Sequence, residues 1–300
     1  RNRREQINLR STRQSRAIRS CFSILPESAM PDIRQRFYFL DGPVRGEIVQ
    51  LQESLNDGFR RHAYPEPIRR LLGELMAASV LLTATLKVEG RLSLLARGNG
   101  RLRMIMAECT HEHAVRAIAQ MDESDADLPA GAGLRELLGH GTLAITLEPD
   151  HGERYQGIVP LDRETLAGCL ETYFERSEQI PTRLWLQSDA SRAAGLMLQV
   201  MPGDERLDDD LWPRATGLAD TLRPGELLDI PPADALYRLY HEEQVSLPEA
   251  QEVRFSCSCS RERTAEGLVS IGQAEAEDVV AEQGEIRLIC QFCQSEYVFT

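Results

Sequence analysis

The sequence contains no apolar run that approaches the roughly 18 residues of a membrane-spanning helix, although 42% of its 300 residues are hydrophobic. It also has no Walker-type phosphate loop, no GxSxG motif and no usable serine–histidine–aspartate set. The signatures of a transmembrane protein, a P-loop nucleotide hydrolase and a serine hydrolase are therefore missing. We expect a protein that is not an enzyme and that has no membrane partner.

Positive charge is also scarce over most of the chain. The formal net charge is −13, and residues 31–300 carry 27 basic and 45 acidic residues, a net charge of −18. A nucleic-acid interface needs clustered basic residues to neutralise phosphates. The charge balance therefore argues against nucleic acid as a partner.

The first 30 residues are the basic exception, with seven Arg and two Glu. They show no clear amphipathic pattern, so a targeting presequence, a basic tail and translation from upstream of a true start at Met30 all stay open. An ordinary globular pattern begins at Met30, which favours the last alternative. We expect residues 1–30 to be a disordered or non-native extension outside the fold.

Cysteine is uncommon, but four of the seven cysteines form two close pairs near the end of the chain. Cys257 and Cys259 form a CxC motif, Cys290 and Cys293 form a CxxC motif, and thirty residues separate the motifs. Two close pairs at such a separation are typical of a four-thiolate zinc site. In an extended strand, residues i and i+2 share a face, so the CxC pair can bind one metal ion.

Residues 254–300 are too few for a self-supporting fold. The CxxC pair fits a turn between two strand candidates, Ile286–Ile289 and Glu296–Phe299. So short a segment hardly offsets ordering costs of ~1.5 kcal/mol per residue, whereas a structural zinc contributes roughly 10–16 kcal/mol. We predict one Zn²⁺ per chain, held by the four cysteines. The alternatives are ordinary buried or free cysteines and a disulfide framework, although nothing in the sequence marks a secreted chain. Zinc-bound thiolates also react with oxidants, so the site can be a brace or a redox trigger.

The middle of the chain predicts an α+β fold. Glu66–Lys87 is the strongest helix candidate, and Asp162–Ser177 is a second. Hairpins with interleaved helices, rather than regular strand–helix–strand repeats, indicate an α+β domain with hairpin-rich sheets. The expected strand pairs are Arg36–Leu40 with Val44–Val49, Leu92–Ala96 with Leu102–Met106, Leu143–Leu147 with Tyr155–Val159, and Thr182–Leu186 with Leu196–Met201.

The character of the sequence changes after residue 203. Prolines interrupt a weak helical pattern, in which Ala233–Glu243 is one short amphipathic helix. Such short helices are not stable alone, so this linker must lean on the α+β domain, the zinc module or both. The predicted division is an extension (1–30), an α+β core domain (31–203), a helical linker (204–253) and a zinc-binding redox-switch domain (254–300).

Three other groups of reactive side chains carry weaker signals. Cys169 falls on the apolar face of the second helix candidate, where a packed residue is a better interpretation than a nucleophile. Cys109 lies beside His111 and His113, but no orienting group for catalysis or metal binding is identifiable. His241–Glu243 begins a partial HExxH match that fails at its last position, so we expect a surface polar cluster.

The motif regions resemble the redox-regulated heat shock protein 33 chaperone family. The resemblance is carried by Phe255–Arg263 around the CxC pair and by Gly284–Cys293 leading to the CxxC pair. It extends from about Arg36 to Phe299. Further similar stretches are Leu81–Lys87, Gly152–Gly157, Tyr173–Leu184 and Arg238–Glu243.

The resemblance implies an ATP-independent holdase that binds unfolded or misfolded clients under oxidative stress in the bacterial cytoplasm. It implies that Cys257, Cys259, Cys290 and Cys293 hold zinc in the reduced state. Oxidation would form the disulfides Cys257–Cys259 and Cys290–Cys293, expel the metal, and unfold the switch domain and linker. The active form would be a homodimer.

Two other classes of protein stay open. A zinc-ribbon module that binds nucleic acid shares the cysteine spacing, although not the acidic charge or the preceding α+β domain. A thiol oxidoreductase could use the CxxC pair, but it needs a thioredoxin-like βαβ setting that the sequence does not show.

Overall fold

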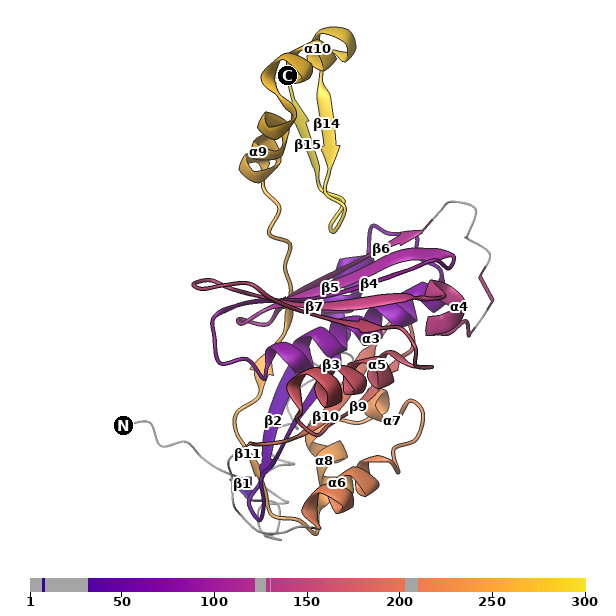
Figure 1. Ribbon diagram of the computed structural model, residues 1–300, viewed down its shortest axis with the longest axis vertical. Helices are drawn as coiled ribbons and strands as arrows, with labels where there is room; N and C mark the ends of the chain where they lie inside the picture. Colours follow the sequence, from indigo (N-terminus) through magenta and orange to yellow (C-terminus); the bar gives the residue numbers. More distant parts are fainter. Residues whose placement is uncertain (1–6, 9–31, 122–127, 130, 203–209) are drawn as a thin grey trace.

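The computed structural model describes residues 7–8, 32–121, 128–129, 131–202 and 210–300. Apart from Ile7–Asn8, the extension 1–30 lies outside the described residues, and so does the expected boundary between residues 203 and 204. The described residues form two large β-sheets with helices between them (Figure 1), which confirms the predicted α+β class.

Sheet A carries most of the N-terminal strands and the end of the linker. In the described part of the chain its order is β1 (Ile7–Asn8), β11 (Val245–Leu247), β2 (Ile33–Phe39), β3 (Val44–Leu51), β10 (Ala193–Val200) and β9 (Thr182–Ser188), and β12 (Gln251–Glu252) also pairs with β2. The pairings β2–β3 and β9–β10 are antiparallel. Two of the four predicted strand pairs are thereby confirmed.

Sheet B contains the other two predicted pairs and one strand that was not predicted. Its order in the described residues is β13 (Arg254–Phe255), β6 (Ala114–Met121), β5 (Leu102–Thr110), β4 (Gly90–Gly98), β7 (Gly141–Pro149) and β8 (Tyr155–Pro160). Pairings β4–β5 and β7–β8 confirm the expected hairpins. The missed strand β6 alternates buried Val115 and Ala117 with Arg116, a period-two pattern that the sequence does contain.

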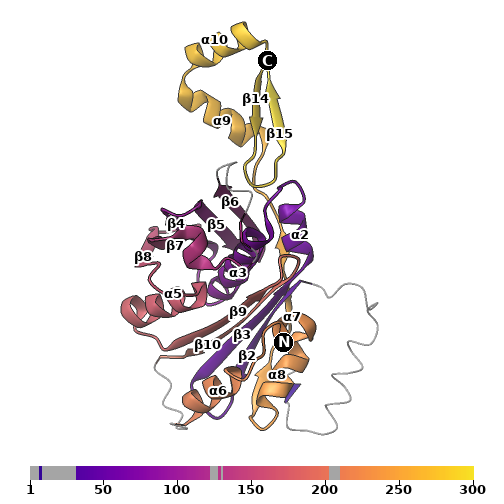
Figure 2. The ribbon, with the colours of Figure 1, turned by 90° about the vertical axis from the view of Figure 1, so that its right-hand side faces the viewer.

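Helix α3 (Glu66–Thr83) fills the space between the sheets, together with α2 (Glu53–Phe59), α4 (Leu134–Leu138), α5 (Leu166–Tyr173) and the π-helix η2 (Phe174–Glu178). Figure 2 shows α3 and α5 in this layer. Almost all of α3 from Leu71 onward is buried because it contacts both sheets. It ends four residues before the predicted Lys87, where hydrogen bonds from Thr85 N–H to Leu82 O and from Leu86 N–H to Thr83 O tighten the chain into turns.

The linker helices α6 (Leu211–Ala219), α7 (Glu226–Asp229) and α8 (Pro232–Tyr240) cover the outer face of sheet A. Their apolar side chains form a second core with Phe37 and Phe39 of β2, against which the fully buried Tyr240 ring packs. Gln50 on β3 donates hydrogen bonds of 2.6 Å to the carbonyls of Leu227 and Ile230. Of the two supports considered for the linker, the α+β domain is therefore the one it packs on.

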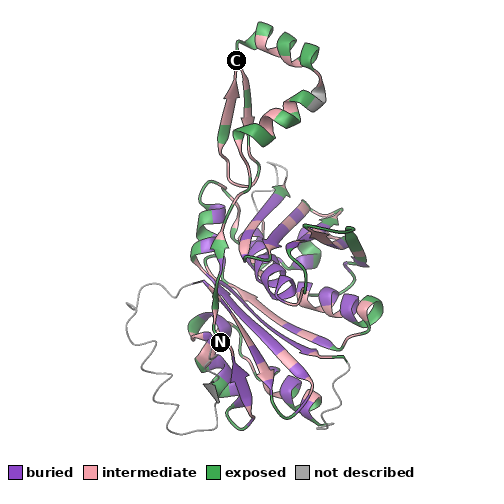
Figure 3. Ribbon diagram, turned by 90° about the vertical axis from the view of Figure 1, so that its left-hand side faces the viewer, coloured by how far each residue is buried: buried purple, intermediate pink, exposed green. Residues whose placement is uncertain are grey.

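The C-terminal module stands at the opposite end of the molecule from these helices (Figures 1 and 2). It consists of the hairpin β14 (Ile286–Ile289) and β15 (Glu296–Phe299), as predicted, and of two helices that were not predicted, α9 (Arg261–Ile271) and α10 (Gln273–Gln283). Their end signals are Ser260, whose hydroxyl caps Arg263 N–H, and Gly272 and Gly284, both with positive φ. Among residues 254–300 whose side chains are described, none is buried (Figure 3).

Candidate metal centre

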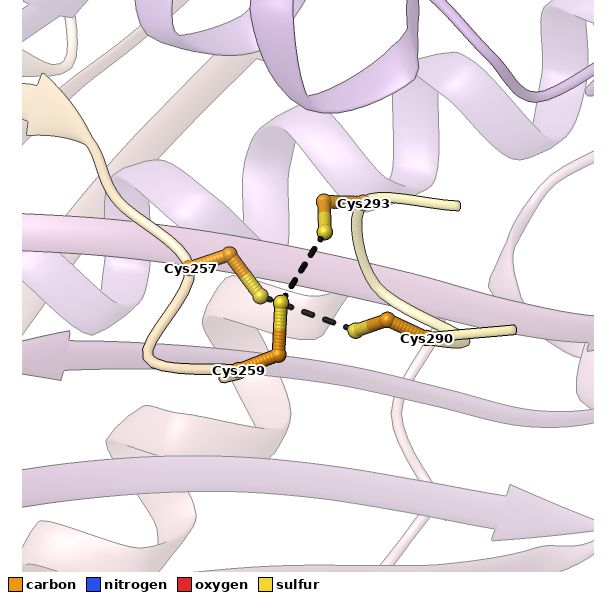
Figure 4. Close-up of side chains that lie close together, drawn as sticks. All are labelled: Cys257, Cys259, Cys290 and Cys293. Atoms are coloured by element: carbon orange, nitrogen blue, oxygen red, sulfur yellow. Dashed lines mark hydrogen bonds between the residues drawn. The ribbon is translucent and has the colours of Figure 1, made fainter. Parts of the chain in front are cut away.

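Two loops bring the four predicted cysteines together (Figure 4). Cys257 and Cys259 follow β13, and Cys290 and Cys293 occupy the turn between β14 and β15. The turn is closed by hydrogen bonds from Cys290 N–H to Ser295 O and from Gln294 N–H to Cys290 O, both 2.8 Å long. The CxC pair differs from expectation in one respect: the strand ends at Phe255, so both thiols lie in a loop rather than on one face of a strand.

The four sulfur atoms all lie within 4.8 Å of one another. Two contacts cross between the loops, at 3.3 Å for Cys259–Cys293 and 3.7 Å for Cys257–Cys290. A tetrahedral zinc with Zn–S bonds of about 2.3 Å holds its sulfurs about 3.8 Å apart, so this donor set fits the ion in number, chemistry and spacing. Because all four sulfurs are close together, proximity does not select one disulfide pairing, and the pairing within each motif stays a prediction.

The pKa values of Cys257, Cys259 and Cys293 are shifted in different directions. Burial opposes ionisation of Cys293, but hydrogen bonds with the hydroxyl and the backbone of Ser295, and with Cys259 and Cys257, lower its pKa to about 6. Burial is the largest cause that raises the pKa of Cys259 to about 12, and burial also raises the pKa of Cys257. As the pH rises, Cys293 is therefore deprotonated before Cys257 and Cys259.

Both loops rest on the α+β domain. The carbonyl of Phe292 lies 2.8 Å from His62 Nε2, Arg61 donates to the carbonyl of Cys293 at 3.4 Å, and Gln120 donates to Gln291 at 3.3 Å. Arg116 on β6 contacts both loops and carries the most extensive of these interactions. Sequence reasoning missed this docking surface because its two sides are more than 140 residues apart.

A short stretch before Cys257 joins the two sheets. Gln251 and Glu252 pair with β2 in sheet A, and two residues later Arg254 and Phe255 pair in parallel with β6 in sheet B. Val253 between them is buried in the core and donates to Asp32 O at 2.9 Å. The four-cysteine site is thus connected directly to both sheets through one extended segment.

Cys109, His111 and His113 have different surroundings in the structure. Cys109 is fully buried, and burial raises its pKa to about 12. His113 Nε2 lies 3.0 Å from Arg34 Nη2 and 2.8 Å from Gln251 Oε1, whereas His111 is exposed and accepts a hydrogen bond from Gly90 N–H. The two histidines therefore engage other groups.

Cys169 and the cluster His241–Glu243 lie in different environments. Cys169 is fully buried on α5, as expected, and burial raises its pKa. His241 and Glu242 are exposed, but Glu243 is buried and accepts a 2.6 Å bond from Arg214 Nε, so the polar cluster lies only partly at the surface. The CxxC pair lies in an antiparallel hairpin, not in the βαβ setting of a thioredoxin-like oxidoreductase.

No helix in the described part of the chain has the length and apolar character needed to cross a bilayer. Residues 32–300 match the family model described as Hsp33 protein. The chain is 48% identical to the 33 kDa chaperonin of Ectopseudomonas mendocina over 90% of this chain and 92% of that protein. It is 47% identical to the 33 kDa chaperonin of Azotobacter vinelandii over 89% and 91% of the two chains. A crystal structure of the 33 kDa chaperonin from Thermotoga maritima superposes with a TM-score of 0.76 at 25% identity, covering 90% of this chain and 95% of that one.

Proposed function

Because the chain belongs to the Hsp33 family, whose members are chaperones, we propose that it is a redox-regulated holdase rather than an enzyme. It binds unfolding proteins under oxidative stress and prevents their aggregation. The observation that carries the proposal is the convergence of four cysteine sulfurs within 4.8 Å at the junction between a coreless module and the α+β domain.

In the reduced state, Cys257, Cys259, Cys290 and Cys293 bind one zinc ion. When bound, the ion holds all four sulfurs as thiolates and contributes folding free energy to the module, roughly 10–16 kcal/mol in small zinc domains. No residue with a described side chain between 254 and 300 is buried, so apolar packing offers little to replace that contribution.

Oxidation turns the four thiolates into two disulfides, Cys257–Cys259 and Cys290–Cys293. Each disulfide forms as two thiolates give two electrons to an oxidant such as hydrogen peroxide, which takes up two protons from the solvent and leaves as two water molecules. Disulfide sulfurs are poor metal ligands, so the cysteines release the ion. Residues 254–300 then lose their main support, and the segment Gln251–Ser256 loses its anchor on one side.

The client surface follows from what the linker covers. Release of β12 and β13 frees the C-terminal end of the linker (204–253), and opening of α6–α8 exposes apolar side chains of sheet A, including Phe37, Phe39 and Leu196. Large exposed apolar patches bind unfolded chains. We propose that this face of the core domain (31–203), together with the opened linker, holds clients, that the active form is a homodimer, and that the protein acts in the cytoplasm without nucleic-acid or membrane partners.

The test measures aggregation of a thermally unfolding client with zinc-loaded reduced protein and with peroxide-oxidised protein, while a metallochromic dye reports released zinc. We expect suppression of aggregation only with the oxidised protein, in step with about one equivalent of zinc. Equal suppression of aggregation by the reduced and the oxidised protein would contradict the redox mechanism. So would the finding that the reduced protein contains no zinc to release.

A further inference from the structure

Arg116 occupies an unusual position between the core of the protein and the cysteine loops. Its side chain is 15% exposed, and its Nε and Nη2 atoms donate to Glu108 at 2.6 and 2.5 Å. On its other side, Nη1 lies 3.1 Å from Ser258 Oγ and 3.7 Å from Cys257 Sγ. The guanidinium carbon lies 4.1 Å from the centre of the Phe292 ring.

These contacts reach both halves of the metal centre at once. Ser258 stands between Cys257 and Cys259, and Phe292 stands between Cys290 and Cys293. One guanidinium can keep both contacts only while the two cysteine pairs face each other. The planar guanidinium can make both contacts because it has N–H donors along its edges and a flat face that stacks on an aromatic ring. The ammonium group of a lysine has no such face.

The core side of the interaction holds the guanidinium in place. Glu108 is 6% exposed and also accepts a 3.2 Å hydrogen bond from Ser93. Arg91 on β4 lies 3.8 Å from the other oxygen of the same carboxylate and pairs with Glu148, and among the described residues its contacts do not include the cysteine loops. Arg116 is therefore aimed at the loops by a fixed, buried anion.

The charge at the far edge of Arg116 depends on the state of the cysteines. Four thiolates and one divalent cation carry a net charge of −2, whereas two disulfides without the cation are neutral. A partly buried guanidinium is stabilised by a nearby anionic acceptor, and hydrogen bonds to charged groups are stronger than those between neutral groups.

We propose that Arg116 senses the charge of the four-cysteine site and couples it to the pairing of β13 with β6. The inference rests on the zinc site proposed above. Arg116 lies on β6 one residue beyond Val115, which pairs with Phe255 in β13. Loss of thiolate charge weakens the contacts to Cys257 and Ser258 and so loosens the strand that immediately precedes them. By linkage, the docked guanidinium strengthens zinc binding by the same factor.

The experiment uses the full chain in its reduced, zinc-loaded form and compares Arg116→Gln with Arg91→Gln. Arg91→Gln is the control, because it removes the other guanidinium near Glu108 and leaves the contacts of Arg116 with the cysteine loops in place. Zinc affinity is measured by competition with a chromogenic chelator, and hydrogen exchange follows the amides of Arg254 and Ser256. Partners that orient metal ligands typically change affinity 10–100-fold. We expect Arg116→Gln to weaken zinc binding about tenfold and to speed exchange of both amides, with Arg116→Lys intermediate and Arg91→Gln near wild type.

Removing Arg116 alone leaves Glu108 with less compensation inside the sheet, so the double variant Glu108→Gln/Arg116→Gln is measured beside it. If the double variant keeps the core folded and shows the same loss of zinc affinity, the coupling is supported. If Arg116→Gln and the double variant bind zinc as tightly as Arg91→Gln does, the inference is overturned. Failure of the wild-type protein to bind zinc would instead refute the proposed metal site.

Discussion

The linker helices α6–α8 and the module helices α9–α10 are all short, yet they are held in different ways. Each linker helix buries its apolar side against sheet A, and Leu236 and Tyr240 are completely inaccessible. The module helices bury no side chain that is described, and with the hairpin they frame an open groove lined by residues such as Leu268, Val280 and Phe299.

This difference separates two sources of stability within the last third of the chain. Apolar packing stabilises the linker, and the domain that supplies this packing does not contain the four clustered cysteines. The sulfur cluster and a few polar contacts to β6 and to His62 hold the module. The linker is therefore less dependent on the zinc module than its short, proline-broken helices suggest, and the two are connected chiefly through Gln251–Ser256.

The largest expected effect comes from removing one sulfur. In Cys290→Ser, the module should lose most of the roughly 10–16 kcal/mol that a structural zinc supplies, so amide protection should vanish across α9, α10 and the hairpin. Exchange should rise next in Val245–Phe255, and it should then rise by a smaller factor in α6–α8, because these helices also pack on sheet A. Hydrogen-exchange mass spectrometry checks the order, with Cys169→Ala as the control outside the cluster. Equal loss of protection in α6–α8 and in the module would mean that the linker depends on the four-cysteine site as much as the module does.

The converse experiment disrupts the linker and spares the metal centre. Leu236→Glu places a charge in the second core, a change that costs several kcal/mol. We expect a loosened linker and client binding without oxidant, while zinc affinity stays unchanged. Tyr237→Glu is the matched control, since Tyr237 lies on the same helix and is 43% exposed. Normal zinc content with no gain in client binding would place the client surface elsewhere.

A pH experiment reports on the α+β side alone. Burial raises the pKa of Glu74 on α3 to about 7, against the opposing effect of Arg70. Between pH 4.5 and 7 the folded state holds more protons than the unfolded state, so this group makes the free energy of unfolding fall as pH rises. Allowing for its partial exposure, Glu74→Gln should stabilise the protein by about 1–2 kcal/mol at pH 8 and hardly at pH 4. Denaturant unfolding of the zinc-loaded protein measures the difference in free energy of unfolding between Glu74→Gln and the wild type. A difference that stays constant from pH 4 to pH 8 would contradict the prediction.

The smallest effect is expected where an apolar residue lies on the module surface. Val269 and Ile289 are 77% and 53% exposed. Val269→Thr and Ile289→Thr should change module stability by no more than about 0.5 kcal/mol, as is usual for surface positions. A chelator titration, with amide exchange of the module as the readout, measures the change in module stability. Leu236→Thr, at a fully buried position of the linker, is the comparison for which a larger loss of stability is expected. A cost above 1–2 kcal/mol would mean that the module has a core of its own.

Local periodicity was sufficient to predict much of this fold. Helix α3 and the four hairpins were predicted because their apolar residues recur at helical spacing or flank turn residues. The cysteine cluster was predicted from spacing alone. Strand β6 was missed because three of its eight residues are Ala, which has a low strand propensity. Helices α9 and α10 were missed because they lack an apolar stripe.

The rest could not be read from the sequence because it depends on contacts between distant segments. Nothing near Arg116 indicates that it faces Ser258, 142 residues later, or that Glu108 holds it there. The support of the linker also depends on which face of sheet A remained uncovered, a property of the assembled sheets. Spacing identifies a set of ligands, but it does not identify the surface on which that set rests.

The segment that joins the two sheets also determines how the protein recovers. A module that has come loose remains covalently attached at Val253, close to the surface of β6 from which it departed. Its return is an intramolecular association, with an effective concentration on the order of millimolar for a short connection. Once the cysteines are reduced and metal is supplied, resetting should be first-order and independent of chaperone concentration. Under the proposed mechanism, the module is therefore an inhibitor that stays covalently linked to the domain it inhibits.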